Sequence, residues 1–270
     1  MNAKDDILHK AVEQLSSGVG RRHRHPSVAC LAEGVALIKA LIFPEYFDDS
    51  VVDDTMRRYS IGTNVDKLYA ILTEQIARVC DDLEAPEVAL QFIAELPELR
   101  RILLTDVDAV FANDPAVDNR GEVIFSYPVV NAMVHYRAAH ALLLMGVPVI
   151  PRIITELAHS ATGIDIHPGA TIGEYFAIDH GTGVVIGQTC IIGNHVTLYQ
   201  GVTLGSKSFE FDDEGHPRAL PRHPIIEDGV TIYSNASVLG RITVGRNAII
   251  GGNVWVTANV PPGAKVVQRT

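Results

Sequence analysis

The spacing of apolar residues changes near residue 160 and divides the chain into two regions. Before that point, apolar residues recur at intervals of three and four, a pattern typical of helices that bury one face. We expect such helices over residues 28–43, 64–83, 86–104 and 129–159. Turns are expected between them, because proline interrupts a helix and clustered polar residues favour loops. The expected breaks are Pro44, Pro86, Pro115 and residues 118–122.

From residue 166 onward, an aliphatic residue recurs every six positions. The first block is Ile166, Ile172, Ile178, Ile186, Ile192, Leu198 and Leu204, and the second is Ile226, Ile232, Val238, Val244, Ile250 and Val256. Such a period predicts a β-solenoid, in which each short strand stacks on the one a full coil earlier. An antiparallel domain would instead show alternation of period two at irregular spacing. The fold class is therefore α+β: an all-α domain over residues 1–160, then a parallel β-helix over residues 161–270.

The six-residue register is interrupted twice. Two extra residues enter around Val184 and Val185, and a longer excursion, expected to protrude as a loop, covers residues 205–225. Insertions in a solenoid become surface loops, commonly at the binding face. We therefore expect the functional site beside these two interruptions.

The composition of the chain argues against several classes of protein. The 270 residues are 47% apolar and 20% charged, as in globular proteins, and the net charge of −10 argues against a nucleic-acid partner. The three cysteines are widely spaced, which predicts neither a disulfide framework nor a structural zinc site. The charged N-terminus and the shortness of the longest apolar run, residues 141–151, predict no signal peptide and no membrane span. We expect a cytoplasmic protein.

His180 is the first candidate for chemistry, because it directly precedes the two-residue insertion. A bulge in a strand changes the direction of its side chains. An imidazole titrates near neutrality and can accept a hydroxyl proton if a carboxylate fixes its tautomer. Asp165 lies 15 residues earlier and should run on the adjacent coil, so it is the candidate carboxylate. A solvated turn residue is the alternative interpretation of His180.

The excursion contains Lys207, Arg218, Arg222 and His223 beside several acidic residues. Two interpretations stay open: a mobile charged loop, or a flap whose cations meet a carboxylate or phosphates, with Arg222 suited to bidentate carboxylate binding. Three histidines from neighbouring solenoid faces could also bind zinc, although no compact ligand spacing supports this.

Five motifs together resemble one known family: DPAVD at 114–118, DIHPGA at 165–170, IDHGTGVVIG at 178–187, GVTLG at 201–205 and RHP at 222–224. They are similar to the serine acetyltransferases of the hexapeptide-repeat acyltransferases. The resemblance covers about residues 114–262. It implies a helical domain on a left-handed β-helix, homotrimers through the solenoids and dimers of trimers through the helical domains. It also implies active sites between subunits, with His180 and His223 facing one another from different chains.

The resemblance further implies roles for individual residues. His180 corresponds to the general base and Asp165 to the carboxylate that orients it. The serine-binding positions correspond to Asp114, Asp179, Arg222 and His223. Arg222 would hold the serine carboxylate, while the two aspartates would accept from its ammonium group. The acetyl-CoA positions correspond to Gly205, Ser206, Ser234 and Gly252.

The implied reaction is direct acetyl transfer from acetyl-CoA to the L-serine hydroxyl, giving O-acetyl-L-serine for cysteine biosynthesis, without a metal. Cys190 is interpreted as a small apolar solenoid residue rather than an acyl carrier. Two departures from the family pattern stand out. Ser206-Lys-Ser-Phe and a longer acidic loop replace the glycine-rich GTGK segment, and the isoleucine-ended tail that binds cysteine synthase is missing. We therefore expect no stable cysteine synthase complex through that tail.

Three alternatives remain. The first is a hexapeptide acetyltransferase for another small hydroxyl or amine acceptor, such as homoserine or a sugar. The second is a γ-type carbonic anhydrase, built on the same solenoid around three histidines and zinc. The third is a scaffold without catalysis, in which the solenoid serves only to form trimers.

Overall fold

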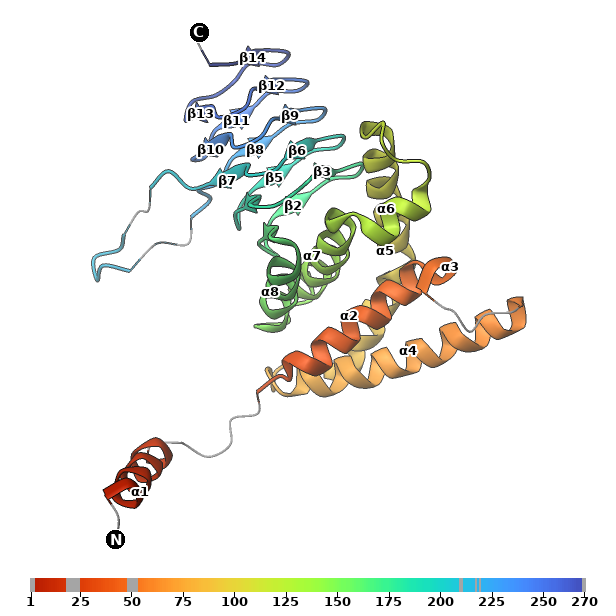
Figure 1. The fold of residues 1–270 in the computed structure, drawn as a ribbon, viewed down its shortest axis with the longest axis vertical. Coiled ribbons are helices and arrows are strands. Elements are labelled where there is room, and N and C mark those ends of the chain that lie inside the picture. The colour runs from red at the N-terminus through yellow and green to blue at the C-terminus, as the bar shows by residue number, and fades with distance from the viewer. Residues whose placement is uncertain are drawn as a thin grey trace.

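The computed structural model describes residues 3–17, 25–47, 53–208, 211–216, 218 and 220–268. A helical region occupies one end of the molecule and a stack of short strands the other (Figure 1). The helices are α1 (Ala3–Ser16), α2 (Val28–Ile42), α3 (Pro44–Phe47), α4 (Asp54–Ala77), α5 (Ala85–Asn113), α6 (Arg120–Ser126), α7 (Pro128–Leu144) and α8 (Ile150–Thr162).

The predicted helices are present, with corrected boundaries. The stretch predicted as one helix over residues 129–159 forms two, α7 and α8, because Gly146 turns the chain with a φ of 82°. The turn predicted over residues 118–122 is wrong in its second half. Helix α6 begins at Arg120, and the Asn119 side chain caps it by accepting a hydrogen bond from the Glu122 N–H at 3.0 Å.

The strands follow α8 in a regular sequence. They are β1 (Asp165–Ile166), β2 (Thr171–Ile172), β3 (Ala177–Asp179), β4 (Val185–Ile186), β5 (Ile191–Ile192), β6 (Thr197–Tyr199), β7 (Thr203–Gly205), β8 (Ile225–Ile226), β9 (Thr231–Ile232), β10 (Ser237–Leu239), β11 (Thr243–Val244), β12 (Ile249–Ile250), β13 (Trp255–Val256) and β14 (Lys265–Val266). Every predicted repeat position lies in a strand and is at most 7% exposed, so the predicted solenoid is confirmed.

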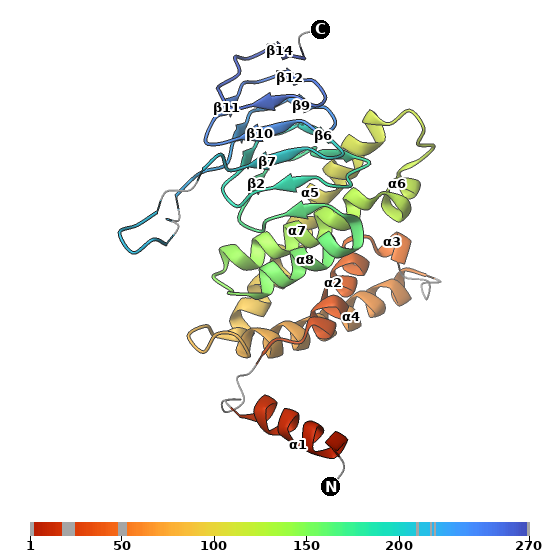
Figure 2. The same ribbon diagram turned by 60° about the vertical axis from the view of Figure 1, so that its left-hand side comes forward.

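The strands form three parallel sheets, which we name by their order along each coil. Sheet A is β1-β4-β7-β10-β13, sheet B is β2-β5-β8-β11 and sheet C is β3-β6-β9-β12-β14. Each coil passes from A to B to C, and the coils stack above α7 and α8 (Figure 2). We call the turns between sheets the AB, BC and CA corners. Two of them, AB and CA, carry the candidate residues.

A buried ion pair attaches the helical region to the first coil. Arg137 of α7 donates to both carboxylate oxygens of Asp106 in α5, at 2.7 and 2.9 Å, and to the Gly173 carbonyl at 2.7 Å. The Phe176 N–H donates to the same carboxylate at 3.1 Å, and Tyr136 donates to the Ala170 carbonyl at 2.6 Å. These bonds hold the first coil in a fixed position on α5 and α7.

None of the helices that the described residues form combines the length and apolarity that crossing a bilayer requires.

Candidate active site

His180 lies at the CA corner of the first coil, directly after β3. Its backbone adopts a φ of 59°, and the following Gly181 has a φ of 88°. A Cβ at Gly181 would lie 2.5 Å from Ile164, so a glycine is required where this corner packs on the start of the solenoid. The turn leaves the His180 side chain 71% exposed, with its Nε2 3.8 Å from an Asp179 carboxylate oxygen. An exposed imidazole beside a carboxylate is suited to proton transfer.

Asp165 opens β1, and its backbone pairs with Val185 of β4, the strand that follows the His180 corner. Asp165 and His180 therefore lie at the start and at the end of the same first coil, so the expectation that they run on adjacent coils is wrong. Its carboxylate faces α8, where an Oδ1 lies 3.7 Å from Nη1 of Arg152. Among the described residues of this single chain, neither a hydrogen bond nor an ion pair joins Asp165 to His180. The pairing of the two therefore stays a prediction.

Asp114 and Asp179 line one small pocket, although Asp114 belongs to the helical region and Asp179 to the solenoid. Asn113, Thr197 and Tyr199 line the same pocket. Asp114 ends α5, and α5 packs against β3, so the docking of the helical region brings the two carboxylates together. A pocket with two carboxylates is suited to bind an ammonium group.

Tyr127 supports Asp114 and was not among the predicted residues. Its hydroxyl donates to an Asp114 carboxylate oxygen at 2.5 Å, and the Ala116 N–H donates to the other oxygen at 2.8 Å. These bonds lower the pKa of Asp114, the tyrosine contributing most, and raise the pKa of Tyr127 to about 12. Asp114 is thus held ionised. No repeat or motif in the sequence marks Tyr127.

His223 lies at the AB corner and is only 7% exposed. Its Nδ1 lies 2.8 Å from the Thr189 hydroxyl and accepts from the Thr189 N–H at 3.1 Å. A Cβ at Gly187 would lie 2.0 Å from the imidazole, so that glycine makes room for the ring. Burial, followed by the charge of Arg222, lowers the pKa of His223 to about 4. The side chain is therefore neutral at physiological pH.

Arg222 stands beside His223 on the wall of a basic pocket. One guanidinium nitrogen donates to Oε1 of Gln188 at 3.2 Å. Three further cations, Lys207, Arg218 and Arg241, line the same pocket. Arg241 is held in place by its bonds to the carbonyls of Thr189 and His223, at 2.7 and 3.0 Å. Four cations around one pocket are suited to bind an anionic group.

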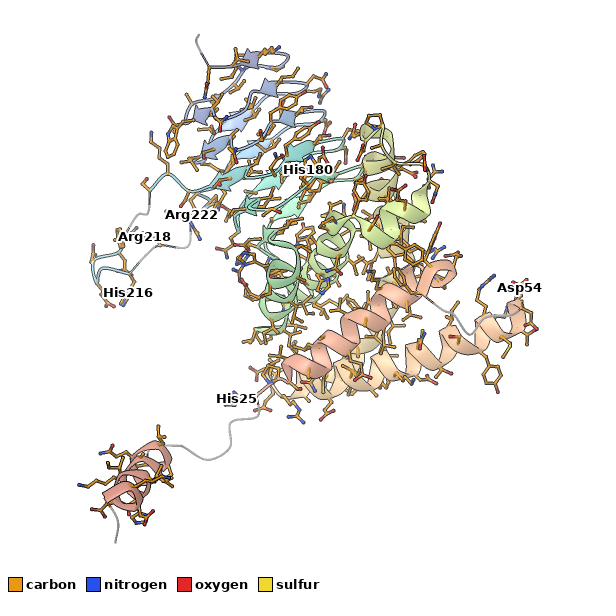
Figure 3. All side chains as sticks on the ribbon, in the orientation of Figure 1. His25, Asp54, His180, His216, Arg218 and Arg222 are labelled. Atoms are coloured by element: carbon orange, nitrogen blue, oxygen red, sulfur yellow. The ribbon has the colours of Figure 1, made fainter. Side chains whose placement is uncertain are left out.

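The described part of the excursion 205–225 projects from the solenoid between β7 and β8 (Figures 1 and 2). At its tip, a carboxylate oxygen of Asp212 accepts from the N–H groups of Glu214 and His216 at 3.0 and 2.8 Å. Arg218 and Arg222 lie between this tip and the solenoid (Figure 3). Both open interpretations retain support, since the tip is exposed and the base of the loop carries the basic pocket.

The candidate residues form two separate groups within one chain. Asp114, Asp179 and His180 gather at the CA corner, whereas Arg222 and His223 lie at the AB corner, and Figure 3 shows His180 well away from Arg222. The two corners are separated by the width of sheet A, about 16 Å for five residues at about 3.3 Å each. A single chain therefore does not bring the two groups together.

The predicted acetyl-CoA positions are divided in the same way. Ser234 and Gly252 stack on successive coils at the CA corner, where a Cβ at Gly252 would lie 3.2 Å from the Ser234 carbonyl. Gly205 and Ser206 lie at the other edge of sheet A, where the excursion begins. Each edge of sheet A thus carries part of the predicted acceptor site and part of the predicted coenzyme site.

The described residues contain one group of side chains close enough to share a metal ion: Glu156, His159 and Asp165. It includes a single histidine, and Arg152 forms ion pairs with both of its carboxylates. A cation in that place disfavours a second one. Cys190 is 1% exposed, and burial raises the pKa of its thiol to about 12, as expected for an apolar solenoid residue.

Comparison with known proteins identifies the family. Residues 223–258 match the model described as bacterial transferase hexapeptide (six repeats). The plasmid serine acetyltransferase of Synechococcus elongatus is 45% identical over 248 residues, covering 86% of this chain and 78% of that protein. This chain belongs to the serine acetyltransferase family. The resemblance inferred from its motifs is thereby confirmed, together with a left-handed β-helix of hexapeptide repeats as its fold.

Other serine acetyltransferases agree with this assignment. That of Bacillus subtilis is 47% identical over 177 residues, covering 63% of this chain and 78% of that protein. The crystal structure of Entamoeba histolytica serine acetyltransferase 1 with L-cysteine is similar with a TM-score of 0.80 at 33% identity, covering 97% of both chains. A soybean serine acetyltransferase complexed with serine has a TM-score of 0.61 at 28% identity, covering 87% of this chain and 97% of that one.

Proposed function

We propose that this member of the serine acetyltransferase family transfers the acetyl group of acetyl-CoA to the hydroxyl of L-serine. The product, O-acetyl-L-serine, is a precursor for cysteine biosynthesis. The observation that carries the proposal is the paired carboxylates of Asp114 and Asp179 in one pocket beside the exposed imidazole of His180. This pocket would accept the ammonium group of an amino acid and place its side chain near a base.

In the proposed reaction, His180 accepts the proton of the serine hydroxyl as the hydroxyl oxygen attacks the thioester carbonyl carbon. Backbone N–H groups stabilise the negative charge that develops on the carbonyl oxygen. The carbon–sulfur bond then breaks, and the imidazolium of His180 returns its proton to the departing thiolate of coenzyme A. Asp165 would orient the imidazole. No acyl-enzyme is needed, which agrees with the buried, high-pKa thiol of Cys190.

We further propose that each active site forms between two subunits of a homotrimer. The CA corner of one subunit would supply Asp114, Asp179 and His180, and the AB corner of its neighbour would supply Arg222 and His223. Arg222 would bind the serine carboxylate, and the neutral His223 would donate to or accept from the substrate without adding charge. The support is the separation of the two groups across sheet A, which a cyclic trimer would close.

The proposed coenzyme positions are also divided between the two edges of sheet A. They are Gly205, Ser206, Ser234 and Gly252. Small residues at these positions leave room for the pantetheine arm to lie along the solenoid. A location in the cytoplasm fits this reaction. We also propose that residues 1–160 form a helical domain and that residues 161–270 form the acetyltransferase domain.

Thiol release from acetyl-CoA tests the reaction, the acceptor and the base together. We expect release with L-serine and much slower release with homoserine or a sugar. His180→Ala should lower kcat by about a hundredfold or more, because general-base catalysis is lost. The matched control is His195→Ala: His195 also has a positive φ, of 56°, but stacks on Tyr175 at the BC corner, so its loss should leave kcat unchanged. Wild-type turnover in the His180 variant would refute the assignment.

A further inference from the structure

Trp255 is the single tryptophan of the chain, and its side chain is 70% exposed on the outermost strand of sheet A. It begins β13, while the next residue, Val256, is buried in the solenoid. Within the described residues, neither an aromatic ring nor a cation stacks on the indole. Within one chain, the indole therefore offers an uncovered aromatic face to a ligand or to a neighbouring chain.

The register of sheet A places Trp255 in line with the candidate active site. Outward side chains at the first position of each strand form one column, which is Asp165, Val185, Thr203, Ser237 and Trp255. The column therefore begins at the carboxylate proposed to orient His180. Four steps between strands at about 4.8 Å each place Trp255 about 19 Å from Asp165. An extended pantetheine arm with its diphosphate spans a comparable length.

The residues along this path leave room for a ligand. The three outward side chains between the ends of the column are Val185, Thr203 and Ser237, none of them large. Gly252 and Ser234, two of the proposed coenzyme positions, lie at the CA corner that leads into β13 and β10. A coenzyme whose thioester lies near His180 and whose arm follows this edge would bring its adenine to the exposed indole.

We propose that Trp255 is the platform on which the adenine of coenzyme A stacks, an inference that rests on the proposed acetyl-CoA reaction. Bases stack on aromatic side chains through their π-faces, and tryptophan offers the largest such face. Trp255 is thus a specificity-determining residue for the donor: it distinguishes acetyl-CoA from acetyl carriers that lack adenosine. It takes no part in the chemistry at His180.

Because Trp255 is the only tryptophan beside eight tyrosines, fluorescence excited at a wavelength that tyrosine does not absorb reports on Trp255 alone. Titration of the full-length wild-type protein with adenosine 3′,5′-bisphosphate, which lacks the pantetheine arm, should quench the fluorescence in a saturable manner. An unchanged emission at saturating acetyl-CoA would overturn the proposal.

Kinetics with two donors supply the second readout. Trp255→Ala should lower kcat/KM for acetyl-CoA about tenfold and leave kcat/KM for S-acetylpantetheine and KM for serine unchanged. Trp255→Phe should retain most of the preference for acetyl-CoA. An equal loss with both donors, or a smaller oligomer in light scattering, would show that Trp255 packs against a second copy of the chain and would overturn the proposal.

These outcomes separate the inference from the proposed function. If the wild type acetylates serine while Trp255→Ala keeps the full preference for acetyl-CoA, only the adenine platform fails. If the wild type releases no thiol with serine, the proposed function fails, and the bisphosphate titration still tests stacking on Trp255.

Discussion

The two histidines of the candidate site differ in how far their side chains are exposed, because they lie at different corners of the solenoid. His180 projects from a corner in the left-handed region and is largely exposed, whereas His223 is buried against Thr189 in the space left by Gly187. An exposed imidazole is available to take up a proton, while a buried one beside arginines stays neutral. In the proposed reaction, the same residue type thus serves as a base at one corner and as a neutral substrate contact at the other.

The buried state of His223 predicts a dependence of stability on pH. Its pKa is about 4 in the folded chain and about 6.5 when unfolded, so the unfolded state binds more protons between these values. The stabilisation is complete above about pH 6.5 and is lost as the pH falls toward 4. Urea unfolding at pH 7.5 and pH 5 should show a larger loss of free energy for the wild type than for His223→Asn. Equal losses would contradict the assignment.

Tyr127 provides a test of the carboxylate pocket. Tyr127→Phe removes the hydrogen bond that contributes most to the lowered pKa of Asp114. The carboxylate is then less firmly oriented and more easily protonated, so KM for serine should rise several-fold, and more at pH 5.5 than at pH 8. Tyr175→Phe at the BC corner is the control and should leave KM unchanged. A pH-independent KM in the Tyr127 variant would argue against ammonium binding by Asp114.

At the scale of elements, the position of Asp114 depends on how α5 and α7 attach to the first coil. The buried pair of Asp106 and Arg137 links these helices to the turn at Gly173 and Phe176. Because Asp114 follows at the end of α5, a shift of this helix would move it away from Asp179. The attachment therefore supports both the fold and the pocket that holds the two carboxylates.

Removal of one partner of the Asp106–Arg137 pair should lower the free energy of unfolding markedly. Arg137→Ala leaves the Asp106 carboxylate buried without its counter-ion, and we expect a loss of about 3–5 kcal/mol in the free energy of unfolding. The matched control is Arg101→Ala, which breaks an exposed ion pair with Glu174 across the same junction and should change stability little. Urea denaturation measures both. Similar small effects for the two variants would contradict the structural role of Asp106 and Arg137.

For the molecule as a whole, the main observation is that one chain carries the two groups of candidate residues at opposite edges of sheet A. In the proposed cyclic trimer, the CA corner of each subunit would meet the AB corner of the next, so that three sites would be completed. The arrangement accounts for the sequence distance between His180 and His223. It also predicts that activity depends on the assembly rather than on the single chain.

Mixed oligomers test this arrangement directly. His180→Ala and Arg222→Ala should each abolish most activity alone, but co-expression should restore about a quarter of wild-type activity, because random assembly pairs an intact CA corner with an intact AB corner at that frequency. Two differently tagged chains allow the mixed oligomers to be purified and assayed. If the mixture stays inactive, both halves of the site must come from the same chain.

The spacing of residues along the chain was enough to predict the solenoid, the inward position of every repeat residue and the corners that carry the candidate histidines. A six-residue period reports local geometry, and local geometry decides which side chains point inward. The helical pattern likewise located α2, α4 and α5, but it joined α7 to α8 and missed α6, because a glycine turn and a single capping residue leave the apolar spacing unchanged.

The contacts between residues far apart in the sequence became known from the folded chain alone. The contact between Tyr127 and Asp114, the shared pocket of Asp114 and Asp179, and the buried pair of Asp106 and Arg137 all join elements that carry no common periodicity. They arise where the helical region packs on the first coil. Such contacts depend on how whole elements pack together, a long-range property that the spacing of residues along the chain does not express.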